Sequence, residues 1–188
     1  AKLARERAEA AGVSDRIDIK LIDYRDFAKS GEQFDRLVSI AMFEAVGRPQ
    51  FETYFRSCAN LLKDDGVMLV HTIGRLGGPG STDAFTSKYI FPGGYVPALS
   101  EVASAFEKEA LWCTDVEVWR MHYADTLKAW HERFEANIDR VRAIYDDRFC
   151  RMWRYYLVAS EQSFRLQRQV VFQFQLTRKI DAVPLTRD

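Results

Sequence analysis

A carboxylate and an imidazole each stand beside an apolar run that is typical of a strand. Glu44 comes just after the run FDRLVSI at residues 34–40, and His71 lies near the end of the run GVMLVHTI at residues 66–73. Ligands bind at the carboxyl ends of parallel strands in an open α/β sheet, so neighbouring strands would bring both side chains to one rim. Apolar neighbours raise the pKa of a carboxylate and suit it to proton transfer. An exposed Glu at a helix start, stabilised by the helix dipole, explains Glu44 equally well.

His71 and Tyr123 also have ordinary structural explanations. A single His in a buried strand is more often a core residue than a catalytic group, and only the shared rim with Glu44 favours catalysis. Tyr123 opens a long predicted helix directly after a strand, so its ring can pack in the core while its hydroxyl reaches the rim. Most such tyrosines only pack. No metal site is predicted, because His71 lacks the second His or Cys that one would need.

Alternating strands and helices must position these residues. The run at 66–73 is almost wholly apolar, which is typical of a strand buried on both faces of a parallel sheet. Ser100 is expected to cap its helix. The order of strand, helix and strand predicts a doubly wound α/β domain. Strands are predicted at residues 16–22, 34–40, 66–73, 114–119 and 170–178, and helices at residues 1–11, 50–62, 100–110, 124–144 and 147–166.

Two segments depart from this rhythm. Residues 74–97 are rich in Gly and Pro around an aromatic centre, and so long an irregular connection is usually a lid or a binding loop. The glycines at its start are not followed by a helix, so they do not form a phosphate-binding turn. Residues 121–166 are a helical insertion rich in Trp and Tyr. Each of these aromatic residues taken singly is ordinary core, but their density above one rim favours a hydrophobic substrate.

The composition argues against several classes of protein. The 188 residues include 27 Lys and Arg and 27 Asp and Glu, and a net charge of zero provides no overall field that attracts nucleic acid. The three cysteines include no CxxC pair, which argues against a disulfide framework or a zinc site and fits a reducing, cytoplasmic compartment. No apolar run approaches the ~20 residues of a membrane span.

Five motifs resemble, in their order along the chain, the cyclopropane-fatty-acyl-phospholipid synthase family, which includes the mycolic acid cyclopropane synthases. They are SIAMFEAVG, LVHTIG, KYIFPGGYVPALSE, HYADTLKAWHERF and RFCRMWRYYL. The resemblance covers almost the whole chain and implies a class I S-adenosylmethionine-dependent methyltransferase with a Rossmann-like, seven-stranded sheet and inserted helices. It also implies the reaction. The cis double bond of an unsaturated phospholipid acyl chain attacks the methyl group of S-adenosylmethionine, and loss of a proton from the new methyl closes a cyclopropane ring.

The same resemblance implies roles for single residues. In the family a bound bicarbonate takes the proton, and the residues that hold it match Glu44, His71 and Tyr123 and the main chain of Ile40. An anion beside a carboxylate requires a shared hydrogen, so Glu44 or the bicarbonate must keep a proton. The positions that match the cofactor pocket are Asp23, Tyr24 and Arg25 beside the adenine, and Ser39 and Ile40 along the same pocket.

The chain also departs from the family pattern. The glycine-rich cofactor loop, the acidic ribose contact and the first two strands lie upstream of residue 1 in the family. We therefore expect residues 1–188 to be the C-terminal portion of a single catalytic domain, which by itself neither folds well nor methylates a substrate. Ser160 stands where many members have a cysteine, so a thiol is expected to be dispensable there.

Two other functions stay open. The same fold can add a methyl group without ring closure and leave a methyl-branched chain, because both reactions start from the same cation. A truncated remnant that binds lipid or a partner without catalysis is the other alternative. We expect the partners to be unsaturated phospholipid acyl chains at the inner face of the membrane, reached by transient binding through basic helices such as 148–168. A homodimer is possible, and nucleic acid is not an expected partner.

Overall fold

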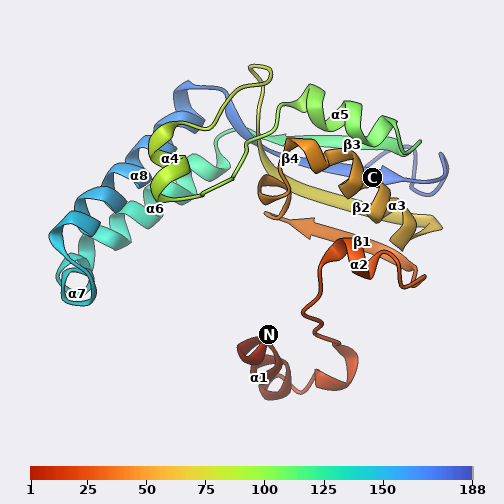
Figure 1. Ribbon diagram of the computed structural model, residues 1–188, viewed down its shortest axis with the longest axis horizontal. Helices are drawn as coiled ribbons and strands as arrows, with labels where there is room; N and C mark the ends of the chain where they lie inside the picture. Colours follow the sequence, from red (N-terminus) through yellow and green to blue (C-terminus); the bar gives the residue numbers. More distant parts are fainter. Residues whose placement is uncertain (188) are drawn as a thin grey trace.

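A computed structural model describes residues 1–187 of the chain. Within these residues the sheet has four strands in the order β1-β2-β4-β3. β1 runs parallel to β2, whereas β4 is antiparallel to both of its neighbours, β2 and β3 (Figure 1). The strands are β1 (Phe34–Ile40), β2 (Leu62–Arg75), β3 (Trp112–Trp119) and β4 (Gln169–Thr177).

The helices fall into three groups along the chain. α1 (Lys2–Ala10) and α2 (Tyr24–Phe27) precede the sheet, and α3 (Phe51–Leu61), α4 (Ala84–Tyr89) and α5 (Leu99–Glu107) lie between its strands in sequence. The third group is α6 (His122–Ala136), α7 (Ile138–Ile144) and α8 (Asp147–Leu166). Three short 3-10 turns complete the described residues: η1 (Ser14–Arg16), η2 (Phe43–Ala45) and η3 (Arg48–Gln50).

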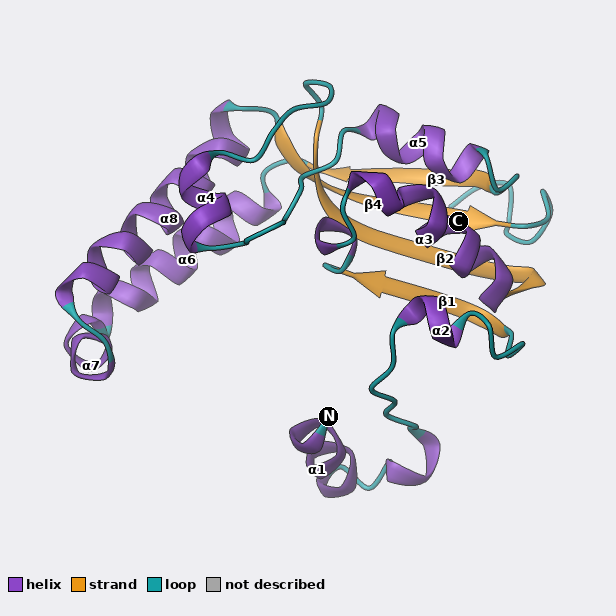
Figure 2. Ribbon diagram, in the orientation of Figure 1, coloured by secondary structure: helices purple, strands orange, loops and turns teal. Residues whose placement is uncertain are grey.

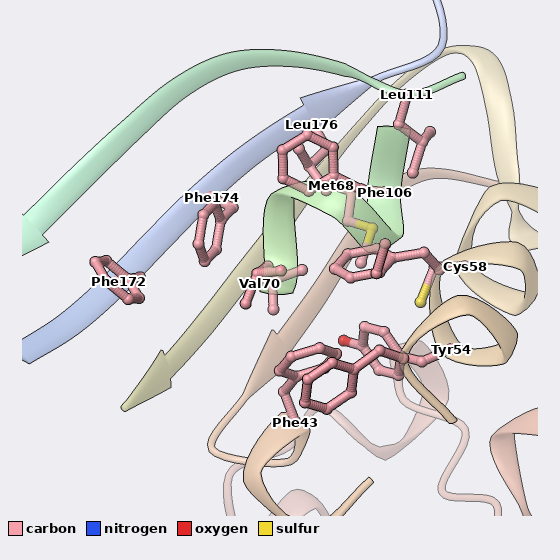
Figure 3. Packing of buried hydrophobic residues seen from close by; sticks show 14 of the residues in the cluster. Phe43, Tyr54, Cys58, Met68, Val70, Phe106, Leu111, Phe172, Phe174 and Leu176 are labelled. Carbon is pink, nitrogen blue, oxygen red and sulfur yellow. The ribbon is translucent and has the colours of Figure 1, made fainter. Parts of the chain in front are cut away.

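The main core lies between one face of the sheet and the helices α3 and α5. β4 sends Phe172, Phe174 and Leu176 into this core, because alternate residues of a strand point to the same face. Phe43 and Tyr54 enter it from the β1–α3 connection and from α3, and both are almost fully buried (Figure 3). This packing fixes the end of β1 against β2, where the predicted functional residues lie.

A second, smaller core holds the third group of helices together. α6 and α8 pack against each other through residues such as Leu127 and Leu157, and Val171 of β4 joins the same cluster. The pair extends beyond one end of the sheet as an arm with α7 at its far end (Figure 2). The predicted helical insertion at 121–166 is therefore a distinct projection whose inner end meets the sheet.

The sequence predicts most elements, including the strand at 34–40 with the same bounds, but the strand predicted at 16–22 is wrong. That segment leaves η1 and continues as irregular chain, and Leu21 is 90% exposed. An alternating pattern forms a strand only where a neighbouring strand can pair with its backbone. No strand of residues 1–187 lies beside this segment, so the pattern has nothing to pair with.

Four smaller differences concern helices and burial. Ser100 is not the cap of α5, because the helix begins one residue earlier and the carboxylate of Glu101 accepts the Ala98 amide at 2.9 Å. The predicted helix at 124–144 is interrupted at Asn137, which separates α6 from α7. Residues 74–97 include the short helix α4. β2 is fully buried on the core face alone, since Val67, Leu69 and His71 on its other face are half-buried.

Candidate functional site

Glu44 extends the sheet by one hydrogen bond beyond the end of β1. The Ala41 amide donates to the His71 carbonyl at 3.0 Å, and this is the last backbone bond between the two strands' ends. At the next position of β2, the Ile73 amide donates to Glu44 Oε1 at 2.7 Å. Phe43, the neighbour of Glu44 in η2, is fully buried and stacks on Phe51, and this packing fixes the position of the Glu44 carboxylate.

The second oxygen of the Glu44 carboxylate has a different environment. Glu44 Oε2 is buried and has no hydrogen-bond partner among residues 1–187. A buried acceptor without a donor costs about 1–3 kcal/mol, so such groups are uncommon in folded proteins. The arrangement leaves one carboxylate oxygen ready to accept a hydrogen bond from a group that is not part of the described chain.

The loop that follows α4 is tied to the backbone of Glu44. The Tyr95 amide donates to the Glu44 carbonyl at 2.9 Å, and the Tyr95 hydroxyl donates to the carboxylate of Glu101 at 2.8–2.9 Å. Glu101 also accepts from Arg48 Nε at 2.9 Å. Glu101 thus joins the loop, η3 and the start of α5, which holds Glu44 from the side opposite β2.

Tyr123 reaches the same site from the first turn of α6. Its ring is half-buried and packs against Phe164 of α8, with ring centres 5.2 Å apart. Burial raises the pKa of the Tyr123 hydroxyl, and the negative charge of Glu44 raises it further. The hydroxyl therefore stays protonated near neutral pH, so it can donate a hydrogen bond.

His71 lies between β1 and β4 in the sheet. It pairs across β1–β2 with Ile40 and across β2–β4 with Gln173, and its ring meets the edge of Trp119 at 5.7 Å. The Gln173 side-chain nitrogen lies 3.1 Å from His71 Nδ1. His71 is two residues before Ile73, whose amide binds Glu44, and the two side chains share a strand face. The prediction that β1 and β2 are neighbours is confirmed, and Glu44, His71 and Tyr123 occur at one end of the sheet.

The predicted cofactor residues divide into two sets. Ser39 is buried beside the Tyr54 hydroxyl, and neither hydroxyl makes a hydrogen bond of full geometry among residues 1–187. The two hydroxyls are close enough to interact, and the Ser39 hydroxyl lowers the pKa of Tyr54 against the larger effect of burial. Tyr24 meets Tyr54 edge-on, with ring centres 5.7 Å apart. Burial raises the pKa of Tyr24 and of Tyr54. Ile40 is 64% exposed beside Ser39 at the end of β1. These residues provide an aromatic ring, an aliphatic side chain and two buried hydroxyls.

Asp23 and Arg25 form the second set, and they bind each other. Asp23 Oδ1 accepts from the Arg25 amide and from Arg25 Nε, both at 2.9 Å, and Oδ2 accepts from Nη2 at 2.7 Å. The Arg25 guanidinium lowers the pKa of Asp23 to about 2. Asp23 is the N-terminal cap of α2 and Arg25 is its ion-pair partner, so both residues have a structural role. Their predicted place in a cofactor pocket stays a prediction.

Sequence reasoning missed Tyr54, Tyr95 and Gln173. Tyr54 sits at helical spacing among apolar residues, and Gln173 alternates with apolar residues in a strand, so neither stands out as functional. The signal was present for Gln173, because a polar side chain in the middle strand of a sheet needs a partner. Tyr95 follows two glycines in the loop, and only the fold brings its amide to Glu44.

Two further observations concern metal ligands and membrane-spanning helices. Across residues 1–187, no three side chains of His, Cys, Asp or Glu are grouped so that they could hold a metal ion. Among the same residues, no helix combines the length and the apolar composition that a bilayer span requires.

Comparison with known proteins places this geometry in a family. The model of the mycolic acid cyclopropane synthetase family matches residues 1–174. The cyclopropane-fatty-acyl-phospholipid synthase of Escherichia coli (strain K12) is 38% identical over 183 residues, which are 96% of this chain and 45% of that protein. The tuberculostearic acid methyltransferase UfaA1 of Mycobacterium tuberculosis (strain H37Rv) is 36% identical over 184 residues, which are 95% of this chain and 42% of that protein.

A solved structure is similar over most of the same region. The mycolic acid cyclopropane synthase CmaA1 complexed with SAH and CTAB matches with a TM-score of 0.71 and 32% identity, over 77% of this chain and 55% of that chain. The chain spans less than half the length of the two curated relatives named above. The match to the family model, the shared class I methyltransferase fold and the carboxylate at the end of β1 together lead to one conclusion. The chain belongs to the mycolic acid cyclopropane synthetase family.

Proposed function

We propose that this chain carries the proton-handling groups of an enzyme that transfers a methylene group from S-adenosylmethionine to the cis double bond of an unsaturated acyl chain in a membrane phospholipid. The observation that carries the proposal is the buried Oε2 of Glu44, which has no hydrogen-bond partner among residues 1–187. The similarity to a cyclopropane-fatty-acyl-phospholipid synthase supports the substrate class. Ring closure must remove one proton from the new methyl group, so such a site needs a positioned base.

The residues around Glu44 fit a small anion that keeps one hydrogen. Bicarbonate has an O–H group that can donate to Glu44 Oε2 and other oxygens that can accept from Tyr123. We therefore propose that Glu44, His71 and Tyr123, with the main chain of Ile40, hold bicarbonate, which when bound supplies a base for the methyl proton. The supporting observation is the buried Oε2 of Glu44, which has no donor among residues 1–187. The O–H group of bicarbonate would supply one.

The residues around Tyr24 fit part of the cofactor. S-adenosylmethionine, when bound, supplies an electrophilic methyl group on a sulfonium ion. The buried hydroxyls of Ser39 and Tyr54 can hydrogen-bond to polar atoms of a ligand, and the Tyr24 ring offers a flat surface for a heterocycle. We propose that Tyr24, Ser39 and Ile40 form one wall of the cofactor pocket, with Asp23 and Arg25 fixing the start of α2 that carries Tyr24.

The proposed residues act in the second step of the reaction, the removal of a proton. The acyl double bond gains a bond to the methyl carbon as the carbon–sulfur bond breaks, which leaves a cation on the acyl chain. Loss of one proton from the added methyl closes the ring, and Glu44 and His71 orient the group that accepts it. Tyr123 donates a hydrogen bond to that group. Aromatic faces stabilise a nearby cation, and Tyr123 and Tyr156 both pack against the second core.

We also propose that the surface shared by α4 and α8 contacts the membrane. Phe85 of α4 packs on Tyr155 of α8, with ring centres 4.7 Å apart, and Tyr155 is 57% exposed. Lys88 lies over the Tyr89 ring, and Lys88 and Arg148 both lower the pKa of the Tyr89 hydroxyl. Aromatic rings beside cations are typical of surfaces that rest on anionic headgroups.

The test is expression in bacteria that lack cyclopropane lipids, followed by analysis of the extracted fatty acids. This chain and the complete reading frame that contains it are expressed in parallel. The expected result for the reading frame is acyl chains that gain one CH2, lose the olefin and show upfield ring-methylene signals by NMR. Glu44→Gln should abolish the product, because the amide places a donor where a proton donor must bind. Glu107→Gln, an exposed carboxylate on α5, is the matched control and should retain it.

The other outcomes identify the alternatives. The same mass gain with the olefin retained would mean methyl branching, which the similarity to a tuberculostearic acid methyltransferase also favours. Unchanged lipids in the presence of well-expressed protein would contradict the proposal and favour a non-catalytic remnant. A product that survives Glu44→Gln would leave the methyl transfer standing but contradict the role of Glu44.

A further inference from the structure

A row of polar side chains crosses the sheet on the face opposite the main core. His71 of β2 pairs with Gln173 of β4, and Gln173 pairs in turn with Glu117 of β3. The neighbours of Gln173 along β4, Phe172 and Phe174, are fully buried on the core face. Gln173 itself is half-buried on the opposite face, where its amide can find a partner within the protein.

The partner of Gln173 is the imidazole of His71. Gln173 Nε2 lies 3.1 Å from His71 Nδ1, which is hydrogen-bond distance. In this structure the amide presents its nitrogen to the ring, and because an amide nitrogen only donates, this orientation makes Nδ1 the acceptor and leaves the proton of the neutral ring on Nε2. The edge-on contact with Trp119, at 5.7 Å and 83°, restrains the same ring from the β3 side. Two contacts therefore define both the orientation and the tautomer of His71.

We propose that Gln173 is a positioning residue that holds His71 as the Nε2–H tautomer, so that Nε2 is a hydrogen-bond donor. Which nitrogen carries the proton of a functional histidine is commonly set by the bond that the other nitrogen makes. A donor at Nε2 suits an anion held beside Glu44 and Tyr123, whereas an unprotonated Nε2 would present a lone pair to it. That last step rests on the proposed function; the tautomer assignment does not.

Gln175 provides the internal comparison. It lies two residues further along β4 on the same face, but its side-chain oxygen accepts a hydrogen bond from the Thr114 hydroxyl at 3.0 Å. It pairs across the sheet with Leu69 rather than with a histidine. A change at Gln175 therefore alters the same strand and the same face without touching His71, which makes it a matched control.

The experiment reads the two ring nitrogens of His71 by long-range 1H–15N correlation NMR on the full chain. The chain has three histidines, and the signals of His71 are the ones absent from His71→Gln. The wild type and Gln175→Glu should both carry the ring proton on Nε2. Gln173→Glu replaces the amide donor with a carboxylate that only accepts, so the proton should move to Nδ1. Both Gln173→Glu and Gln175→Glu add one negative charge to β4, but only Gln173→Glu removes the hydrogen bond to His71. A difference between the two variants therefore reports on the hydrogen bond.

The outcomes separate this inference from the proposed function. A wild-type proton on Nδ1, or an unchanged tautomer in Gln173→Glu, would overturn the inference whatever the enzyme does. If Gln173→Glu does not fold, Gln173→Asn shortens the side chain by one carbon and should release Nδ1 from its donor, which the same spectrum detects. A tautomer that switches as expected in a protein that leaves phospholipids unchanged would contradict the proposed function and leave the role of Gln173 intact. With both correct, Gln173→Glu should also lower product formation at least tenfold, while Gln175→Glu retains it.

Discussion

At the scale of single residues, the site combines one satisfied and one unsatisfied oxygen on the same carboxylate. The bond from the Ile73 amide fixes where Glu44 lies, and the buried Oε2 keeps the capacity to accept one more hydrogen bond. An unpaired buried acceptor costs about 1–3 kcal/mol, which the packing of Phe43 next to it can offset. Ser39 and Tyr54 repeat the pattern with two buried hydroxyls that make no hydrogen bond of full geometry among residues 1–187. These three groups are therefore the best-supported ligand contacts in the chain.

The Asp23–Arg25 pair makes a prediction about pH. Arg25 lowers the pKa of Asp23 from 3.8 to about 2 in the folded chain, so the pair's contribution to folding is present above the ordinary value and is lost as the pH falls through about 2. The pair is exposed to solvent, so its effect on global stability is small. Arg25→Gln should return the pKa of Asp23 toward 3.8, measured by the carboxyl 13C shift. Lys63→Gln, which removes the partner of Asp35 instead, should leave the pKa of Asp23 unchanged. A wild-type Asp23 that already titrates near 3.8 would contradict the pairing.

At the scale of elements, the sequence predicts those structures whose signal is local. The apolar run at 34–40 has the bounds of β1, and the alternation at 170–178 differs by one residue from β4. The same kind of alternation at 16–22 does not form a strand, because a strand depends on a neighbour and alternation carries no information about one. The interruption at Asn137 was missed because helical spacing continues through it.

The site shows the same division between local and distant information. Glu44 and His71 could be placed at one rim because Glu44 follows one strand signal, His71 lies near the end of the next, and the two strands are neighbours. The Tyr95 amide on Glu44 and the Gln173 amide on His71 join residues 51 and 102 positions apart, and no spacing rule reaches that far. The roles implied by the family resemblance came from motifs, and they stay predictions.

Gly74 makes a prediction about how β2 meets the rest of the fold. A Cβ at this position would overlap the ring of Phe172 and lie 3.1 Å from the Pro97 carbonyl oxygen, whereas a Cβ at Gly77 would have no atom within 4 Å. Gly74→Ala must therefore displace a core ring and should lower the free energy of unfolding by about 1–3 kcal/mol. Gly77→Ala should change it by less than about 0.5 kcal/mol. Urea denaturation of both variants is the measurement, and equal stabilities would contradict this packing of β2 on β4.

At the scale of the whole molecule, the residues proposed for the site come from three parts of the chain. The sheet and the connection that follows β1 carry His71 and Glu44, the arm carries Tyr123, and the segment before β1 carries Tyr24. The arm is held to the sheet by the second core, in which Val171 packs with Leu127 and Leu157. The segment that contains α1 is attached differently: it lies apart from the sheet and is joined to it by irregular chain (Figure 1). These attachments predict unequal stability across the molecule.

Amide hydrogen exchange should therefore divide the chain into two regions. Ala8 is the one buried residue of α1, and Arg5 binds the Ile19 carbonyl at 2.7 Å within the same segment. A nine-residue helix is marginal in water without tertiary packing, so the amides of residues 2–10 should exchange with little protection while those of β2 and β4 are protected.

Limited trypsin digestion should cut first after Arg16 or Lys20, which are exposed, and later after Arg178, whose guanidinium binds the carbonyls of Ala59 and Leu62. Val70→Ala in the main core should speed exchange in β2 without changing it in α1, because the two regions share no core. Protection of residues 2–10 equal to that of β2 would mean that α1 packs against the sheet in solution, and the cofactor wall assigned to Tyr24 would then need to accommodate it.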